Sequence, residues 1–321
     1  MTLTFLTPIG VLLALAFIVP LTALLLVRRR ARRVRGALGV SEPSRRGLAV
    51  WLLSLVVASA LIGLAAAQPV LAQTKTLRVR TDAEVWFVLD VSRSMLAQAD
   101  PGSPTRFARA TSAAEKFRAS LAGTPVGIAS MTTRVLPHLF PGANEDVFQT
   151  TLDRSLGIER PPPPTGLATV ATDLSSLGMI RGLRYFSPST KKRLVVVFTD
   201  GESTAVTNAR VGTIFRQSPA IGLVFVHVWN GDERVFTRNT PEAAYLPDPA
   251  ARSTLDRLAE STRGSVYSEG DLDAAVQAGR ELLGDGPTAV RGESGRRHAL
   301  APYLALVAFL PLTLLLARPD V

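Results

Sequence analysis

The sequence predicts an α/β fold, in which a doubly wound, mostly parallel sheet is flanked by transmembrane helices. Two apolar runs, residues 85–89 and 194–198, are rich in β-branched and aromatic residues, and they lead to Asp90 and Asp200. Such runs are typical of strands buried on both faces of a parallel sheet. Between residues 81 and 288 short apolar runs alternate with helical patterns, which favours a doubly wound topology.

The other elements of this region follow from the spacing of apolar residues. From Phe107 to Leu121 such residues recur at helical spacing, and Asn144 can cap a second helix that has two acidic residues in its first turn. Further helices are expected at 174–183, 255–261 and 272–283. The expected strands are 126–131, 135–140, 192–199, 221–229 and 265–267. A long polar loop, residues 231–250, is expected at the same edge of the sheet as Asp90.

Three uncharged apolar runs lie outside this region, at residues 9–27, 48–67 and 299–317. Each is about as long as the roughly 20 residues that a helix needs to cross a bilayer. The sequence therefore predicts two transmembrane helices within residues 1–80, a central domain at 81–288, and a linker with a third transmembrane helix at 289–321. Residues 68–80 are expected to be a linker.

An arginine-rich loop, residues 28–47, sets the expected topology. It holds eight arginines against one acid, Glu42, and by the positive-inside rule it is cytoplasmic. The domain at 81–288 is then extracytoplasmic, in a multi-pass protein of the cell membrane. Cleavage near Ala67 or Ala72, where small residues resemble signal-peptidase sites, remains an alternative that would release the domain.

The charge distribution argues against a nucleic-acid surface. The formal net charge of the chain is +10, but residues 81–290 hold 21 Lys and Arg against 23 Asp and Glu. The excess positive charge belongs to the arginine-rich loop and the flanking segments, where it indicates topology. The chain has no cysteine, so the domain must be stable without a disulfide.

Oxygen-bearing side chains follow both apolar runs. Asp90, Ser92 and Ser94 alternate directly after the first run, and Asp200 follows the second. The carboxyl ends of neighbouring parallel strands meet at one edge of a sheet, and oxygen-only ligands suit a hard cation such as Mg²⁺ or Mn²⁺. A simple turn that caps the next helix is the alternative for an isolated motif of this kind.

Asp90-x-Ser92-x-Ser94 with Thr199-Asp200-Gly201 resembles a von Willebrand factor A (VWA) domain, a Rossmann-like fold, and its metal-ion-dependent adhesion site (MIDAS). The resemblance covers roughly residues 81–288 and implies a further threonine from a loop between the two motifs. Within residues 161–174 we expect Thr169 to take this place, because a helical pattern starts soon after it, and Thr165 remains an alternative.

The order of the segments narrows the resemblance. Two apolar runs with an arginine-rich loop before the domain, and one run after it, are similar to the BatA-type membrane proteins, often called aerotolerance-type. This resemblance implies other VWA-type membrane proteins and a MoxR-family AAA+ ATPase as partners.

The sequence predicts a binding protein and no enzyme. It shows no arrangement of nucleophile and base and no phosphate-binding loop. We expect a membrane-anchored module that accepts an acidic side chain of a protein partner at the metal, in complex assembly or chaperoning. Tyr245 and Phe236 of the loop 231–250 are the expected contact residues. An envelope stress sensor or a transport accessory subunit is the alternative.

Overall fold

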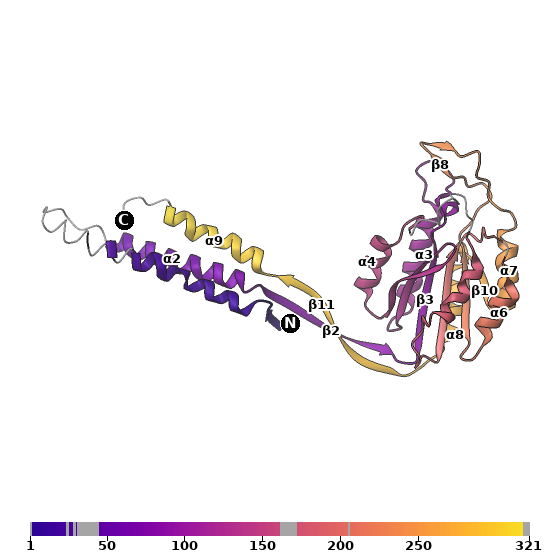
Figure 1. Ribbon diagram of the computed structural model, residues 1–321, viewed down its shortest axis with the longest axis horizontal. Helices are drawn as coiled ribbons and strands as arrows, with labels where there is room; N and C mark the ends of the chain where they lie inside the picture. Colours follow the sequence, from indigo (N-terminus) through magenta and orange to yellow (C-terminus); the bar gives the residue numbers. More distant parts are fainter. Residues whose placement is uncertain are drawn as a thin grey trace. The chain divides into compact units, whose positions relative to one another are not determined.

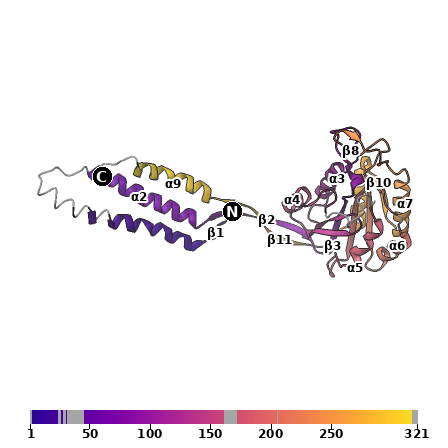
Figure 2. The same ribbon diagram turned by 45° about the horizontal axis from the view of Figure 1, so that its top comes forward.

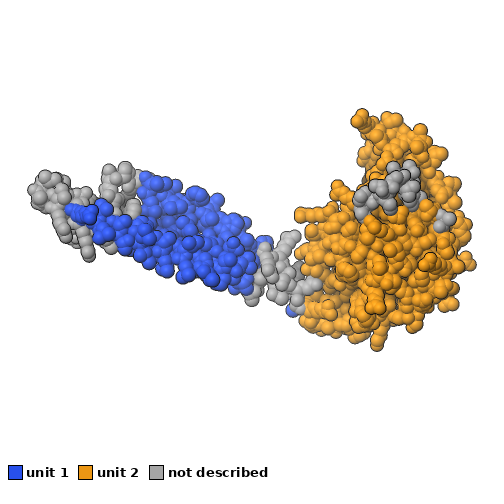
Figure 3. All heavy atoms as spheres, viewed as in Figure 1, with its two compact units in different colours: residues 1–76, 292–321 blue, residues 77–291 orange. Residues whose placement is uncertain are grey.

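The computed structural model describes residues 2–23, 26–27, 30, 45–160, 172–204 and 206–316. The chain divides into two compact units (Figure 3). Unit 1 comprises Met1–Thr76 and Gly292–Val321, and unit 2 comprises Leu77–Arg291. The sequence places the central domain at residues 81–288, which lie within unit 2.

Unit 2 is built on a six-stranded sheet with the order β10-β7-β6-β3-β4-β5. All neighbouring strands run parallel except β5, which pairs with β4 in the antiparallel direction. The strands are β3 (Ala83–Asp90), β4 (Val126–Met131), β5 (Val135–Gly142), β6 (Lys192–Thr199), β7 (Ile221–His227) and β10 (Ser265–Ser268). The predicted α/β fold with a mostly parallel sheet is therefore confirmed.

Side chains of the central strands alternate between two hydrophobic cores, one on each face of the sheet. In β3, Phe87 and Leu89 lie in one core, whereas Trp86 and Val88 lie in the other. Phe87 makes edge contacts with the rings of Phe117 and Phe198, at centroid distances of 5.4 Å. Because both faces of the strand are covered, its sequence is continuously apolar rather than alternating.

Helices cover both faces, as Figure 1 shows for α3 and α4 on one side and for α6 and α7 on the other. The core that contains Phe87 includes residues of α3 (Arg106–Ser120), α4 (Glu145–Ser155) and α8 (Leu272–Leu283). The opposite core includes residues of the 3₁₀ helix η3 (Leu174–Gly178), α5 (Met179–Gly182), α6 (Asn208–Arg216) and α7 (Ala251–Thr262).

Several short elements of unit 2 differ from the prediction. The helix expected at 174–183 consists of η3 and the four-residue α5, and α6 follows β6 where no helix was predicted. Helix α6 is only nine residues long and carries Gly212, a residue type that disfavours helices. The loop 231–250 contains a small hairpin, β8 (Phe236–Thr237) and β9 (Thr240–Pro241), which stands at one end of the unit in both ribbon views (Figures 1 and 2).

Unit 1 combines helices with a three-stranded sheet. Its helices are the 3₁₀ helix η1 (Pro8–Phe17), which continues as helix to residue 23, α2 (Arg45–Ala66) and α9 (Ala301–Leu316). The strands have the order β1-β2-β11, namely Thr2–Phe5, Pro69–Arg80 and Thr288–Ala299, and the division between the two units falls within β2 and β11. The expected linker at 68–80 is therefore largely a strand. Of the two candidate cleavage positions, Ala67 is buried and Ala72 pairs with Thr2.

The predicted membrane spans are not confirmed by the helices of unit 1. In the described part of the chain, no helix combines the length and the apolar character that crossing a membrane requires. Most of the arginine-rich loop lies outside the described residues.

We expect the Phe87→Ala substitution to lower the free energy of unfolding by about 3–5 kcal/mol, because it removes a fully buried ring from between two others. Phe140, which is 64% exposed and makes an edge contact with the ring of Trp86 at a centroid distance of 5.7 Å, is the matched control, and Phe140→Ala should cost about 1 kcal/mol. Urea unfolding followed by tryptophan fluorescence measures both values. Equal losses in the two variants would contradict the assigned core.

Candidate functional site

The Asp90 carboxylate ends β3 and is completely buried. Its Oδ1 accepts hydrogen bonds from the backbone N–H of Ser92 at 2.9 Å and from Thr172 Oγ1 at 2.9 Å. Its Oδ2 accepts hydrogen bonds from Thr199 Oγ1 at 2.6 Å and from Thr172 Oγ1 at 3.0 Å. No lysine, arginine or histidine of the described residues forms an ion pair with it. Asp90 is therefore a buried, hydrogen-bonded anion without a protein counter-charge.

The two serines of the motif lie directly beside this carboxylate. Ser92 is buried, and its Oγ lies 3.0 Å from Ser94 Oγ. Ser92 precedes the 3₁₀ helix η2 (Arg93–Leu96), but its side chain makes no capping hydrogen bond, and helix α3 is capped by Thr105 instead. Asp90 does accept a hydrogen bond from the Ser92 N–H, as in a simple turn. A turn that caps the next helix does not, however, explain why the hydroxyls of Ser92 and Ser94 lie together.

Asp200 follows β6 at the same edge of the sheet and is also completely buried. Its Oδ1 accepts a hydrogen bond from the Glu202 N–H at 3.0 Å, and its Oδ2 lies 3.0 Å from Arg106 Nη1. Gly201 adopts φ +77°, a conformation that favours glycine, and a Cβ there would approach Ala251 O to 3.0 Å. The glycine after Asp200 thus permits the tight turn that places the carboxylate.

The threonine that the structure brings to Asp90 is Thr172. It is fully buried, and its carbonyl accepts hydrogen bonds from Ser203 Oγ and from the Thr204 N–H. The expected Thr169 and the alternative Thr165 lie outside the described residues. Asp173, the next residue, caps η3, so a Thr-Asp pair directly before the apolar pattern from Leu174 onward was the signal that could have indicated Thr172.

A second, unpredicted feature is the guanidinium of Arg106, which is fully buried beside Asp200. Besides that carboxylate, it contacts Glu202 Oε1 at 2.8 Å, Glu233 Oε2 at 2.6 Å and the Tyr245 hydroxyl at 2.8 Å. Burial alone would lower the pKa of Arg106, but these anionic neighbours raise it, so the group stays charged. Sequence offered no signal for this role, because the contacts lie on segments far apart in the chain.

The two aspartates differ in how their charge is compensated. Burial raises the pKa of Asp90 above its ordinary value, against the opposing effect of its hydrogen-bond donors. Burial and the neighbouring charge of Asp90 raise the pKa of Asp200 to about 7, although Arg106 and a hydrogen bond from Ser94 act in the opposite direction. A further cation close to both carboxylates would stabilise their ionised forms and lower both pKa values.

Counting charges shows the size of the imbalance. Four buried carboxylates lie around the site, and two cations pair with them: Arg106 and the partly exposed Arg109, which also binds the more exposed Glu269. Four carboxylates and two guanidinium groups leave a formal charge of −2. The network therefore carries an excess of negative charge, which a cation would neutralise. The carboxylates are those of Asp90, Asp200, Glu202 and Glu233.

The donor set fits such an ion. The side-chain oxygens of Asp90, Ser92, Ser94, Thr172 and Asp200 gather at one sheet edge, and oxygen ligands of low total charge suit Mg²⁺ or Mn²⁺. In the described residues there is no group of three or more His, Cys, Asp or Glu that could hold a metal ion. The five donors named above comprise two carboxylates and three hydroxyl groups.

The loop 231–250 is held at the site by hydrogen bonds and an ion pair. The Tyr245 hydroxyl is a hydrogen-bond partner of Glu202 and Arg106, so Tyr245 positions the loop instead of presenting a free polar group to a partner. Burial raises the pKa of this hydroxyl, which stays protonated. Arg93, within the Asp-x-Ser-x-Ser motif, pairs with Glu242 of the loop. Phe236, the other expected contact residue, is half-buried.

His227 packs against the turn that follows β6. It lies at the end of β7, where Nε2 is 2.9 Å from the Asp200 carbonyl and the ring stacks on Trp229. Burial lowers the pKa of His227 to about 4, so the imidazole is neutral near neutral pH. Its role is to fix the turn that carries Asp200.

Residues 85–202 match the family described as von Willebrand factor type A domain. This match and the mostly parallel sheet confirm the VWA fold that the sequence motifs implied. No curated protein matches the chain.

Among solved structures, the chain is similar to a conserved hypothetical protein BatB from Bacteroides thetaiotaomicron, with a TM-score of 0.52, 16% identity and coverage of 62% of this chain and 98% of that one. It is also similar to an aerotolerance-related membrane protein from Bacteroides fragilis (TM-score 0.48, 18% identity, 62% and 99% coverage). A third similar structure is proximal thread matrix protein 1 from the mussel byssus with a zinc-occupied MIDAS motif (TM-score 0.41, 14% identity, 77% and 54% coverage). At these identities the likeness concerns the fold alone.

We expect Arg106→Met to lower the free energy of unfolding by about 3–5 kcal/mol, because it leaves three buried carboxylates without their shared cation. Arg109→Met removes a partly exposed guanidinium from the same network and should cost about 1 kcal/mol or less. Urea unfolding of both variants compares the two losses. Equal, small losses would show that Arg106 does not hold the site together.

Proposed function

We propose that unit 2 binds a protein partner through one divalent cation, Mg²⁺ or Mn²⁺, at the VWA metal site. The observation that carries this proposal is the fully buried Asp90 carboxylate, which has hydrogen-bond donors but no cationic partner in the described part of the chain. Asp90, Ser92, Ser94 and Asp200 would hold the ion. Thr172 supplies the additional hydroxyl, and Thr169 and Thr165 are the alternatives.

The ion, when bound, supplies an electrophilic coordination position that a partner's acidic side chain can take. The hydroxyls are neutral and the two aspartates contribute two charges, so an added carboxylate meets no excess of negative charge at the ion. Thr172 and Thr199 orient the Asp90 carboxylate by donating to its oxygens. Arg106 binds one oxygen of Asp200 and so fixes the orientation of that carboxylate.

Recognition by this site combines charge with surface area. The loop 231–250, held by Tyr245 and by the Arg93–Glu242 pair, supplies a positioned surface next to the metal. A charged contact at the centre gives orientation and specificity, and the surrounding surface adds contact area. The chemistry needs no nucleophile or base, and the protein is proposed to be a binding component and not an enzyme.

The setting of this function is also a proposal. Unit 1 exposes large apolar side chains on all three of its helices, including Ile9, Leu53 and Leu306, which are 78%, 65% and 72% exposed. Together with the arginine-rich loop, these side chains support a membrane anchor with unit 2 outside the cytoplasm. Other VWA-type membrane proteins and a MoxR-family AAA+ ATPase are the proposed partners, in complex assembly or chaperoning.

If the metal is the contact, Ser92→Ala or addition of EDTA should weaken partner binding at least about tenfold, or roughly 1.4 kcal/mol. The measurement is retention of membrane proteins on the immobilised full chain, with Mg²⁺ present or chelated. Ser189→Ala is the matched control, because Ser187 and Ser189 form the same kind of hydroxyl pair at 3.0 Å without a buried carboxylate. If the partner is retained equally well in EDTA and in Mg²⁺, the ion does not contact the partner and has at most a structural role.

The proposed topology has its own test. A reporter fused within residues 28–47 should give a cytoplasmic signal, and a reporter fused after residue 290 should give an extracytoplasmic one, because the arginines resist translocation. Replacing the arginines of the loop by glutamine should weaken this preference. A cytoplasmic signal from the second fusion would overturn both the proposed location and the choice of partners.

A further inference from the structure

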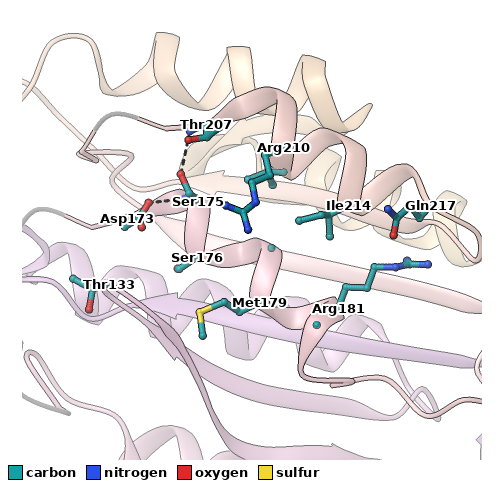
Figure 4. A pocket seen from close by; sticks show the side chains of 13 residues that line it. Thr133, Asp173, Ser175, Ser176, Met179, Arg181, Thr207, Arg210, Ile214 and Gln217 are labelled. Carbon is teal, nitrogen blue, oxygen red and sulfur yellow. Dashed lines mark hydrogen bonds between the residues drawn. The ribbon is translucent and has the colours of Figure 1, made fainter.

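A groove of about 620 Å³ lies between the η3–α5 segment and helix α6, outside the metal site (Figure 4). It exists because the segment that covers this part of the sheet is short: η3 and α5 together span nine residues. The groove is narrow at Gly178, where a Cβ would meet Ile214 Cδ1 at 3.0 Å. At Gly182 a Cβ would meet nothing within 4 Å, so the groove opens in that direction.

Two arginines and one aspartate in the lining give the groove a net formal charge of +1, and among the described residues neither arginine forms an ion pair with a carboxylate. Arg210 is exposed and extends from α6 across the groove in Figure 4. Arg181 donates its hydrogen bonds only to the carbonyls of Ser218 and Pro219. The one acidic side chain in the lining is Asp173, which already accepts a hydrogen bond from the Ser175 N–H. The groove therefore offers two guanidinium groups to an anionic ligand.

The same groove has apolar and hydroxyl-bearing walls. Met179 is 39% exposed, and Ile214 is only partly buried, so both can contact an aliphatic side chain. Thr207 and Ser175 lie opposite one another and are joined by a hydrogen bond from the Thr207 N–H. Cations beside apolar surface in an open groove match an extended peptide that carries both acidic and aliphatic residues.

The groove begins one residue from the metal site. Thr172 donates to the Asp90 carboxylate, and Asp173, the next residue, lines the groove. Ser203 joins the segment after β6 to residues 172–174, because its hydroxyl donates to the Thr172 carbonyl and accepts from the Leu174 N–H. The groove and the metal site are therefore adjacent along the chain, at Thr172 and Asp173.

We propose that the η3–α6 groove binds an acidic, aliphatic-rich segment of the protein partner whose carboxylate reaches the metal. This inference rests on the proposed function, because it assigns a second contact to the same partner. Carboxylates of the segment pair with Arg181 and Arg210, while an aliphatic side chain covers Met179 and Ile214. Contacts at both the groove and the metal fix the direction of the bound segment. A single carboxylate at the metal would leave that direction open.

The test uses the purified full chain and a short fluorescein-labelled peptide of alternating Glu and Leu, with fluorescence anisotropy as the readout. Arg210→Glu should weaken binding at least about tenfold, or roughly 1.4 kcal/mol. Arg216→Glu makes the same charge change at the end of the same helix but outside the lining, and should change the affinity less than about twofold. A peptide with Lys in place of Glu should not bind.

Gly182→Trp provides a second variant, which fills the open end of the groove without changing its charge and should also weaken binding. Circular dichroism verifies that the variants are folded. Equal effects of Arg210→Glu and Arg216→Glu, absence of binding to the unmodified chain, or equal binding of the Lys peptide would each overturn the inference. Self-association of the chain that Arg210→Glu abolishes would assign the groove to a second copy and likewise overturn it.

Repeating the titrations in EDTA separates this inference from the proposed function. If the difference between Arg210→Glu and Arg216→Glu persists in EDTA while EDTA itself has no effect, the groove binds the segment and the metal does not. If EDTA or Ser92→Ala weakens binding and Arg210→Glu does not, the metal contact is correct and the groove assignment is wrong.

Discussion

A buried carboxylate is stable only when hydrogen bonds and opposite charge replace the water that it has lost, and Asp90 has the hydrogen bonds alone. The second aspartate of the pair, Asp200, is compensated by Arg106, whose guanidinium also joins Glu202 and Glu233. The site is thus organised around one carboxylate that shares a guanidinium partner and one that has none among the described residues. This asymmetry explains why a cation is proposed beside Asp90 and why Arg106 must be buried.

The fold supplies this arrangement through its parallel strands. β3 and β6 are neighbours and end at the same edge, so Asp90 and Asp200 are brought together by apolar burial of the strands and not by the charges themselves. Ligand sites beyond the carboxyl ends of strands are the usual outcome in open α/β sheets. The loop after β7 then closes over Arg106 through Tyr245, which links the metal site to the surface that surrounds it.

Local patterns predicted the strands of the six-stranded sheet, the α/β fold class and the place of Asp90, Ser92, Ser94 and Asp200 after two of these strands, because each of these depends on residues adjacent in the chain. Contacts between distant segments were not predictable in this way. Arg106 lies in the first turn of α3 and resembles a solvent-facing residue, yet its partners are 94 or more residues away. The pairing of β1, β2 and β11 is equally non-local, and hydropathy alone did not determine the lengths of the helices in unit 1.

The most direct test of the account is whether Mg²⁺ stabilises the chain through Asp90. Urea unfolding of the full chain near neutral pH, followed by tryptophan fluorescence, should show stabilisation of about 2.7 kcal/mol when free Mg²⁺ is 100 times its dissociation constant. Asp90→Asn keeps the shape of the side chain but removes its charge, and this variant should show no such stabilisation. Absence of stabilisation in the unmodified chain, or the same stabilisation in Asp90→Asn, would contradict the account.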